Sequence, residues 1–173
     1  MCLIAFVAWG VVRHQHAYQT GRRASAALTV ATEVPVGEVV PPLLGRDNAG
    51  GLTSGPAGAT LLLVYSETCD VCLLNWPQWQ MLRQSAAAAN VPVTLVTLSA
   101  IDTTSYRERY QFTGLRTPDP TTLISYRLRY APQTILVGHS SEVKGVWTGA
   151  LTDTQRRAVE HGLASVGSPP PTH

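Results

Sequence analysis

Residues 59–72 read ATLLLVYSETCDVC, a continuous apolar run followed by two cysteines three positions apart. The run at residues 59–65 is bounded by Gly58 and by the polar residues 66–68, which is typical of a strand buried on both faces of a sheet. A helical pattern of apolar residues starts at the cysteines. The stretch therefore predicts a buried strand that leads directly into a helix carrying Cys69 and Cys72.

The two cysteines lie where this helix begins, and that position has a chemical use. Unpaired backbone N–H groups and the positive end of the helix dipole stabilise a thiolate. We expect Cys69, nearer to solvent, to be the attacking thiolate, and Cys72, one turn further in, to be the resolving thiol. The predicted catalytic residues are Cys69 and Cys72, and the predicted chemistry is thiol–disulfide exchange.

Other interpretations of the cysteine pair are also open. Half of a structural zinc site is one, but such a site needs two more ligands, usually another Cys pair or a His pair, and neither occurs near a second hairpin in this sequence. A chance spacing is another. A static disulfide in a binding module is a third, and its reduction potential would lie below about −300 mV. We expect no metal and no cofactor.

Further strands and helices follow on both sides of the cysteine motif. Strand, helix, strand and helix alternate through the centre of the chain, which predicts parallel neighbours in an α/β sheet. Thr152 and Gln155 have the spacing of a capping box that opens a last helix. The predicted elements are a hairpin from residues 36–46 and 52–53 around a turn at 47–51, a helix at 72–89 kinked by Pro77, a strand at 91–98, a helix at 103–112, a rigid loop at 117–120, a short helix at 121–127, paired strands at 133–137 and 143–147, and a helix from 153 to about 165.

The composition excludes several classes of protein. Of the 173 residues, 45% are hydrophobic, which is enough for one core. Charged residues make up 14% and the net charge is +2, so we expect no nucleic-acid surface. Three cysteines exclude a scaffold held by several disulfides.

Residues 1–12 read MCLIAFVAWGVV and contain no charged side chain. A helix of this length spans about 18 Å, whereas the hydrocarbon core of a bilayer is about 30 Å thick. A signal peptide, a partial membrane anchor and a buried apolar segment are all open, and we favour the anchor. The predicted organisation is an apolar leader or partial anchor at 1–12, a tether at 13–34, one domain at 35–166 and a disordered tail at 167–173.

The basic residues after the apolar run bear on which side of the membrane the domain lies. Arg13, Arg22 and Arg23 follow the apolar run and would hold that side in the cytoplasm. This charge bias conflicts with the placement that we expect for the domain. We expect membrane attachment through residues 1–12 with the domain on the extracytoplasmic side, and the alternatives are a secreted or a cytoplasmic protein.

Several features occur in a fixed order over roughly residues 36–165. They are Gly37-x-x-x-Pro41, LLLVY at residues 61–65, Thr68-Cys69-Asp70-Val71-Cys72, Pro77, and Ala131-Pro132-Gln133-Thr134. Together they resemble the TlpA-like (redoxin, AhpC/TSA-type) thiol-disulfide oxidoreductases of the thioredoxin superfamily. The resemblance implies a thioredoxin-like fold with a central mixed sheet, an amino-terminal hairpin and an extra helix before a cis-proline.

The resemblance also implies an activity and a substrate site. Its partners would be protein thiols and disulfides and an upstream redox partner. The peptide bond between Ala131 and Pro132 would be cis and would face the cysteines, so these two residues are predicted to bind substrate. Trp76, one turn after Cys72, is predicted to line the rim of the site, although large aromatic residues on helices usually belong to the core.

Two positions depart from the pattern of the resembled family. Many members carry a glutamate three residues after the second cysteine, where this chain has Asn75, and thioredoxin itself keeps a buried aspartate where this chain has Leu63. Deprotonation of Cys72 would then rely on water, Asp70 or Glu67.

Two other functions on a related fold are alternatives. A thiol peroxidase of the peroxiredoxin type needs Pro and Thr in the pattern P-x-x-x-T-x-x-C, and Leu62 and Ser66 occupy those positions here. A copper chaperone or binding module would use both thiolates and a distant histidine, for which His139 is the candidate.

Overall fold

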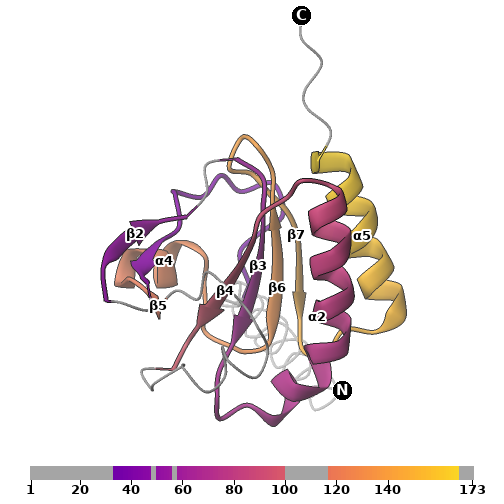
Figure 1. The fold of residues 1–173 in the computed structure, drawn as a ribbon. Helices are drawn as coiled ribbons and strands as arrows, with labels where there is room; N and C mark the ends of the chain where they lie inside the picture. Colours follow the sequence, from indigo (N-terminus) through magenta and orange to yellow (C-terminus); the bar gives the residue numbers. More distant parts are fainter. Residues whose placement is uncertain (1–32, 48–49, 56–57, 100–116, 168–173) are drawn as a thin grey trace, which may run out of the picture. The chain divides into compact units, whose positions relative to one another are not determined.

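A four-stranded sheet forms the centre of the part of the chain that the computed structural model describes, namely residues 33–47, 50–55, 58–99 and 117–167 (Figure 1). The strand order is β4–β3–β6–β7. β3 and β4 are parallel, whereas β3 pairs with β6 and β6 with β7 in antiparallel fashion. The sheet is therefore mixed, as predicted, and its strands are β3 (Thr60–Tyr65), β4 (Val93–Thr97), β6 (Gln133–Val137) and β7 (Val143–Thr148).

Every residue of β3 is buried, which confirms the prediction from its continuous apolar run. Leu61, Leu63 and Tyr65 belong to one core cluster, and the alternating Leu62 and Val64 belong to another. Alternation follows from the two-residue period of a strand. The first cluster is closed by α2 (Asp70–Ala88) and α5 (Asp153–Gly167), which lie side by side on one face of the sheet (Figure 1).

Helix α2 begins immediately after Cys69, its N-cap residue, two residues before the predicted start. The helix continues through Pro77. Ala89 is the C-cap residue, and Asn90 follows with a φ of 54°, a left-handed conformation that asparagine tolerates at helix ends. The predicted stop before Pro92 is thus confirmed.

A small second sheet contains the end of the predicted hairpin and one strand that we did not predict. Residues 36–43, predicted as part of the first hairpin strand, lie outside this sheet, and Val39 forms an isolated bridge with Glu142 instead. β1 (Leu44–Arg46) pairs with β2 (Leu52–Ser54), and also with β5 (Thr117–Pro118), which corrects the prediction of a rigid loop at 117–120. Gly45 permits this pairing, because a Cβ atom there would lie 2.6 Å from the carbonyl oxygen of Thr117.

The remaining helices begin at polar caps. In α4 (Pro120–Ser125), Asp119 accepts a hydrogen bond from the Thr122 amide at 2.7 Å. Before α5, Thr152 and Gln155 exchange the two reciprocal hydrogen bonds of the predicted capping box. The helix predicted at 103–112 lies outside the described residues.

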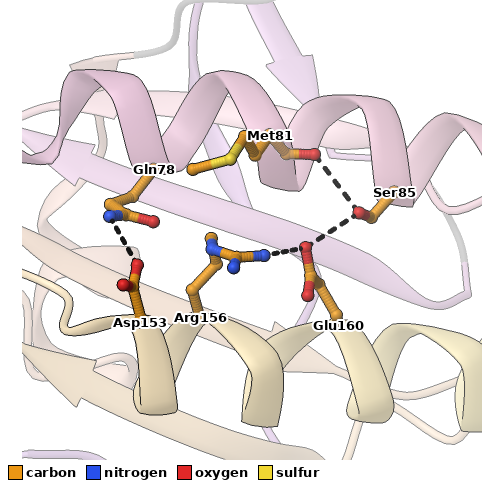
Figure 2. A network of polar contacts seen from close by, with 6 residues as sticks. All are labelled: Gln78, Met81, Ser85, Asp153, Arg156 and Glu160. Atoms are coloured by element: carbon orange, nitrogen blue, oxygen red, sulfur yellow. Dashed lines mark hydrogen bonds and ion pairs between the residues drawn. The ribbon is translucent and has the colours of Figure 1, made fainter.

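Polar side chains connect α2 and α5 along their contact (Figure 2). Glu160 receives hydrogen bonds from both Ser85 and Arg156, and Gln78 donates to Asp153 at 3.2 Å. Ser85 also donates to the carbonyl oxygen of Met81. These contacts fix the pairing of the two helices that cover the first core cluster.

Two observations concern the predicted organisation of the chain. Val34, placed at the end of the predicted tether, is 2% exposed and packs in the second core cluster, so ordered packing begins before residue 35. Within the described ranges, no helix has both the length and the apolar character needed to cross a bilayer. The predicted leader lies outside these ranges.

Candidate redox site

The two cysteines are free and lie one turn apart at the amino end of α2. The Cys69 amide donates to the carbonyl oxygen of Ser66 at 3.1 Å, and the Cys72 amide donates to that of Cys69 at 3.0 Å. The turn between β3 and α2 therefore holds both sulfurs at the carboxyl end of a central strand. This is the placement that the sequence predicted.

The two thiols differ in exposure. Cys69 is partly buried, whereas Cys72 is 1% exposed and belongs to the first core cluster. Burial raises the pKa of the Cys72 thiol, and a hydrogen bond with the Cys69 side chain raises it further, while the Ser66 backbone opposes the shift. Cys72 thus holds its proton at neutral pH, and Cys69 is the sulfur that an incoming molecule can reach.

Ala131 and Pro132 lie across from Cys69, on the segment that enters β6. Val64 of β3 pairs with Gln133 of β6, so the end of one strand adjoins the start of the other. The Cys69 thiol donates to the Ala131 carbonyl oxygen at 3.3 Å. The peptide bond between Ala131 and Pro132 is cis. The structure thus brings together the two predicted catalytic cysteines and the two predicted substrate-binding residues.

Trp76 is half-buried and packs against the first core cluster, as Cys69 and Ala131 also do. Its ring meets that of Trp79 edge-on, with centroids 6.4 Å apart. Trp79 is fully buried, and its indole N–H donates to the Thr134 hydroxyl at 3.0 Å. Trp76 is therefore the outer member of an aromatic pair whose inner member attaches α2 to β6.

Asn75 is completely buried and has a role that sequence reasoning missed. Its side-chain amide donates to the Gly149 carbonyl oxygen at 2.9 Å, and its oxygen accepts from the Leu151 amide at 2.6 Å. The sequence marked this position only as a missing carboxylate. Its place three residues after the buried Cys72, on the same helix face, was the available signal. Leu63, the other departure, is a core residue with no exposed surface.

Glu67 lies two residues before Cys69 and is a carboxylate with one buried oxygen atom. Its Oε1 atom is buried and has no hydrogen-bond partner among the described residues, whereas Asp70 is exposed. Burial raises the pKa of Tyr65 to about 12, and the charges of Glu67 and Cys72 add to that rise. The charges of Glu67 and Cys72 therefore both act on the Tyr65 phenol.

Hydroxyl groups surround the same corner of the sheet. The Ser99 hydroxyl is 3.0 Å from the Ser66 hydroxyl and accepts from the Glu67 amide at 3.0 Å. The Ser99 amide donates to the Thr97 hydroxyl at 3.1 Å, and the Thr97 side chain lowers the pKa of the Tyr65 phenol against the effect of burial. These contacts link the ends of β3 and β4 in the residues that precede the cysteine motif.

The predicted copper-ligand set is not assembled. His139 lies in the turn after β6, at the opposite end of that strand from Pro132. Five strand residues separate the two ends, and at about 3.3 Å per residue this is roughly 16 Å. In the described part of the chain, no three His, Cys, Asp or Glu side chains are grouped so that they could hold a metal ion.

The arrangement of sheet and helices, together with the cysteine pair after β3, defines a thioredoxin-like fold. Solved structures with this fold include a thiol:disulfide interchange protein from Bacteroides sp., with a TM-score of 0.62 and 16% identity over 75% of this chain and 91% of that one. The thioredoxin domain of a thiol-disulfide oxidoreductase from Bacteroides vulgatus matches with a TM-score of 0.60 and 19% identity over 75% of this chain and 98% of that one.

A peroxidoxin from Mycobacterium tuberculosis matches as well, with a TM-score of 0.61 and 14% identity over 76% of this chain and 97% of that one. No family model and no curated protein matches the sequence. At these identities the likenesses show the fold alone, and the chemistry has to be argued from the site.

Proposed function

We propose that this protein is a thiol-disulfide oxidoreductase that exchanges disulfides with protein clients through Cys69 and Cys72. The observation that carries the proposal is the pairing of a reachable thiol at a helix N-terminus with a buried thiol one turn inside. Similarity in fold to proteins described as thiol:disulfide interchange proteins supports it.

In the reducing direction the exchange has two steps. The Cys69 thiolate attacks one sulfur of a client disulfide, a mixed disulfide forms, and the other client sulfur leaves as a thiolate that takes up a proton. The Cys72 thiol then loses its proton and attacks the Cys69 sulfur. The bond between Cys69 and the client breaks, the second client thiol is released, and a Cys69–Cys72 disulfide remains. An upstream dithiol returns the pair to the reduced state.

Glu67 is the group proposed to accept the Cys72 proton. A buried thiol with a raised pKa needs an acceptor before it can attack. The Oε1 atom of Glu67 has no competing hydrogen bond within the described residues, and the phenol of Tyr65 has both Glu67 and Cys72 as neighbouring charges. Asp70 is exposed and is the less suitable acceptor.

Ala131, Pro132 and Trp76 are proposed to contact the client. The Ala131 carbonyl oxygen is already within hydrogen-bond distance of the Cys69 sulfur, so a client sulfur bonded to Cys69 has to lie beside this segment. Exposed apolar side chains, Val71 and Tyr130, flank the cysteine and the entry to β6 and offer contact area to a protein rather than to a small molecule.

The test is reduction of insulin by the full chain in the presence of dithiothreitol. We expect acceleration by the native protein and by Cys2→Ser, and none by Cys69→Ser. Cys72→Ser, first reduced and then freed of dithiothreitol, should accumulate a mixed disulfide with insulin that is visible on a non-reducing gel and disappears on reduction. The proposed activity would be ruled out if the native protein did not accelerate insulin reduction and the Cys72→Ser variant formed no adduct.

Peroxide reduction is the second candidate, favoured by the fold match to a peroxidoxin. Against it, Leu62 is a fully buried core residue, and Ser66 bonds to Ser99 and Thr68 through its hydroxyl. Thiol-dependent consumption of hydrogen peroxide, measured on the same samples, separates the two activities.

A further inference from the structure

A chain of hydrogen bonds leads from α2 to the Ala131–Pro132 segment without passing through the cysteines. Asn75 donates to the Gly149 carbonyl oxygen at 2.9 Å. The Gly149 amide in turn donates to the Pro132 carbonyl oxygen at 2.9 Å. Asn75 lies one turn after Cys72, so the helix that carries the sulfurs also holds, through one intermediate residue, the segment opposite them.

The Asn75 side chain makes a second hydrogen bond to the same connection. The Leu151 amide donates to the Asn75 oxygen at 2.6 Å, so one side chain bonds to both Gly149 and Leu151 in the connection between β7 and α5. Gly149 has a φ of 89°, a conformation that lets the chain leave β7 at this point while its amide still faces Pro132. All polar atoms of the Asn75 side chain are thus directed to this connection inside the core.

The second link between α2 and the same segment depends on the redox state. It is the bond from the Cys69 thiol to the Ala131 carbonyl oxygen. A thiol has a hydrogen to donate, but a thiolate, a mixed disulfide and an intramolecular disulfide have none. This hydrogen bond is therefore absent in each form through which an exchange reaction passes, whereas the link from Asn75 through Gly149 to Pro132 persists.

We propose that Asn75 is a positioning residue that holds the Ala131–Pro132 segment against the cysteine helix in the states in which Cys69 carries no hydrogen. The proposal rests on the proposed function, because it assigns to Asn75 the alignment of a protein client with the sulfur of Cys69. A small disulfide reagent needs no such alignment, since it meets Cys69 alone.

Two substrates measured on the same variants test this role. For Asn75→Ala we expect the KM for insulin to rise at least tenfold, while the rate of attack of Cys69 on the small aromatic disulfide DTNB stays within twofold of the native value. Ser85→Ala is the matched control, because it also removes a side-chain link between α2 and α5 but has no connection to Pro132. Ser85→Ala should change neither the KM for insulin nor the rate of attack on DTNB. Equal losses with both substrates in Asn75→Ala would overturn the proposal.

A measurement on the native protein covers the case in which Asn75→Ala does not fold. Hydrogen exchange of the Gly149 amide, followed by NMR, should be slow in both the reduced and the oxidised protein. Fast exchange on oxidation would mean that the link to Pro132 breaks with the thiol, which contradicts the proposal. Because this readout needs no client, it stands even if insulin reduction fails and the proposed activity with it.

Discussion

The Cys72 thiol has to lose its proton inside the core before the exchange can finish. At 1% exposure it receives little help from solvent, and burial together with the neighbouring Cys69 raises its pKa. A raised pKa means that the thiolate fraction at neutral pH is small and grows about tenfold with each pH unit below the pKa. The second step, rather than the first attack by Cys69, is therefore expected to be sensitive to a nearby base.

Glu67→Gln tests which group supplies that base. In the reaction with DTNB, Cys69 releases one thiol product and Cys72 releases the second, so stopped-flow absorbance separates the two steps. We expect the second release to slow by roughly 100-fold at pH 7, a usual contribution of a positioned base. The rate should recover about tenfold per pH unit, because hydroxide replaces the carboxylate. Asp70→Asn is the control, and a slower second release in that variant alone would assign the role to Asp70.

Helix α2 is attached to the sheet by its own side chains at a point that also borders the site. The Trp79 indole donates to the Thr134 hydroxyl in the core, two residues after Pro132. A buried hydrogen bond of this kind contributes about 1 kcal/mol net, and an unpaired partner costs about 1–3 kcal/mol. The attachment therefore matters for the fold as a whole, beyond the redox chemistry.

Trp79→Phe should lower the free energy of unfolding by about 2–4 kcal/mol, because it leaves the Thr134 hydroxyl unpaired and removes buried ring atoms. Thr134→Val removes the other partner with little change of shape. Urea denaturation of both single variants and of the double variant gives the coupling energy, which we expect to be about 1 kcal/mol. Strictly additive losses would show that the hydrogen bond contributes nothing.

Helices and strands that are specified by their own residues were predictable from the sequence. Strands that form only by pairing with residues far away in the chain were not. β3 could be recognised from its apolar run, α5 from its capping box, and the end of α2 from Asn90 and Pro92. β5 is a strand only because two of its residues meet β1, more than 70 positions away, at a glycine without a side chain in the way. Nothing in its own sequence indicates that pairing.

The candidate site divides in the same manner. The two cysteines were predictable from their spacing and from the apolar strand before them. Ala131 and Pro132 were predicted from the resemblance to a family. Asn75 and Glu67 gain their significance from burial, since one is a satisfied amide in the core and the other has a buried, unpartnered oxygen atom. Burial of a polar side chain is a property of the packed molecule, and periodicity alone cannot reveal it.

The whole molecule should lose stability in alkaline solution. Burial raises the pKa of both Tyr65 and Tyr126 from 10.0 to about 12, and that of Cys72 also rises. Each group binds its proton more tightly in the folded chain than in the unfolded chain. Its contribution is complete below the ordinary pKa and is lost as the pH rises towards the folded value. The stability of the reduced protein should therefore fall between about pH 9 and pH 12.

Urea midpoints of the reduced protein at several pH values from 7 to 11 check this expectation. Tyr126→Phe is the informative comparison, because the Tyr126 hydroxyl donates to the Pro41 carbonyl oxygen at 2.8 Å. The variant should be less stable at pH 7, having lost that bond, yet should lose less between pH 9 and pH 11. Parallel curves for the two proteins would show that Tyr126 has no part in the alkaline loss.

The distance along the chain between the two halves of the site has a consequence for biosynthesis. Cys69 and its acceptor Ala131 are 62 positions apart. At about 5–20 residues per second, a ribosome needs roughly 3–12 s to make that stretch. During this interval both cysteines have been synthesised while β6, the neighbour that completes the sheet beside them, does not yet exist. For these seconds the two cysteines lack the strand that later lies beside them, and an oxidant would meet them without that neighbour.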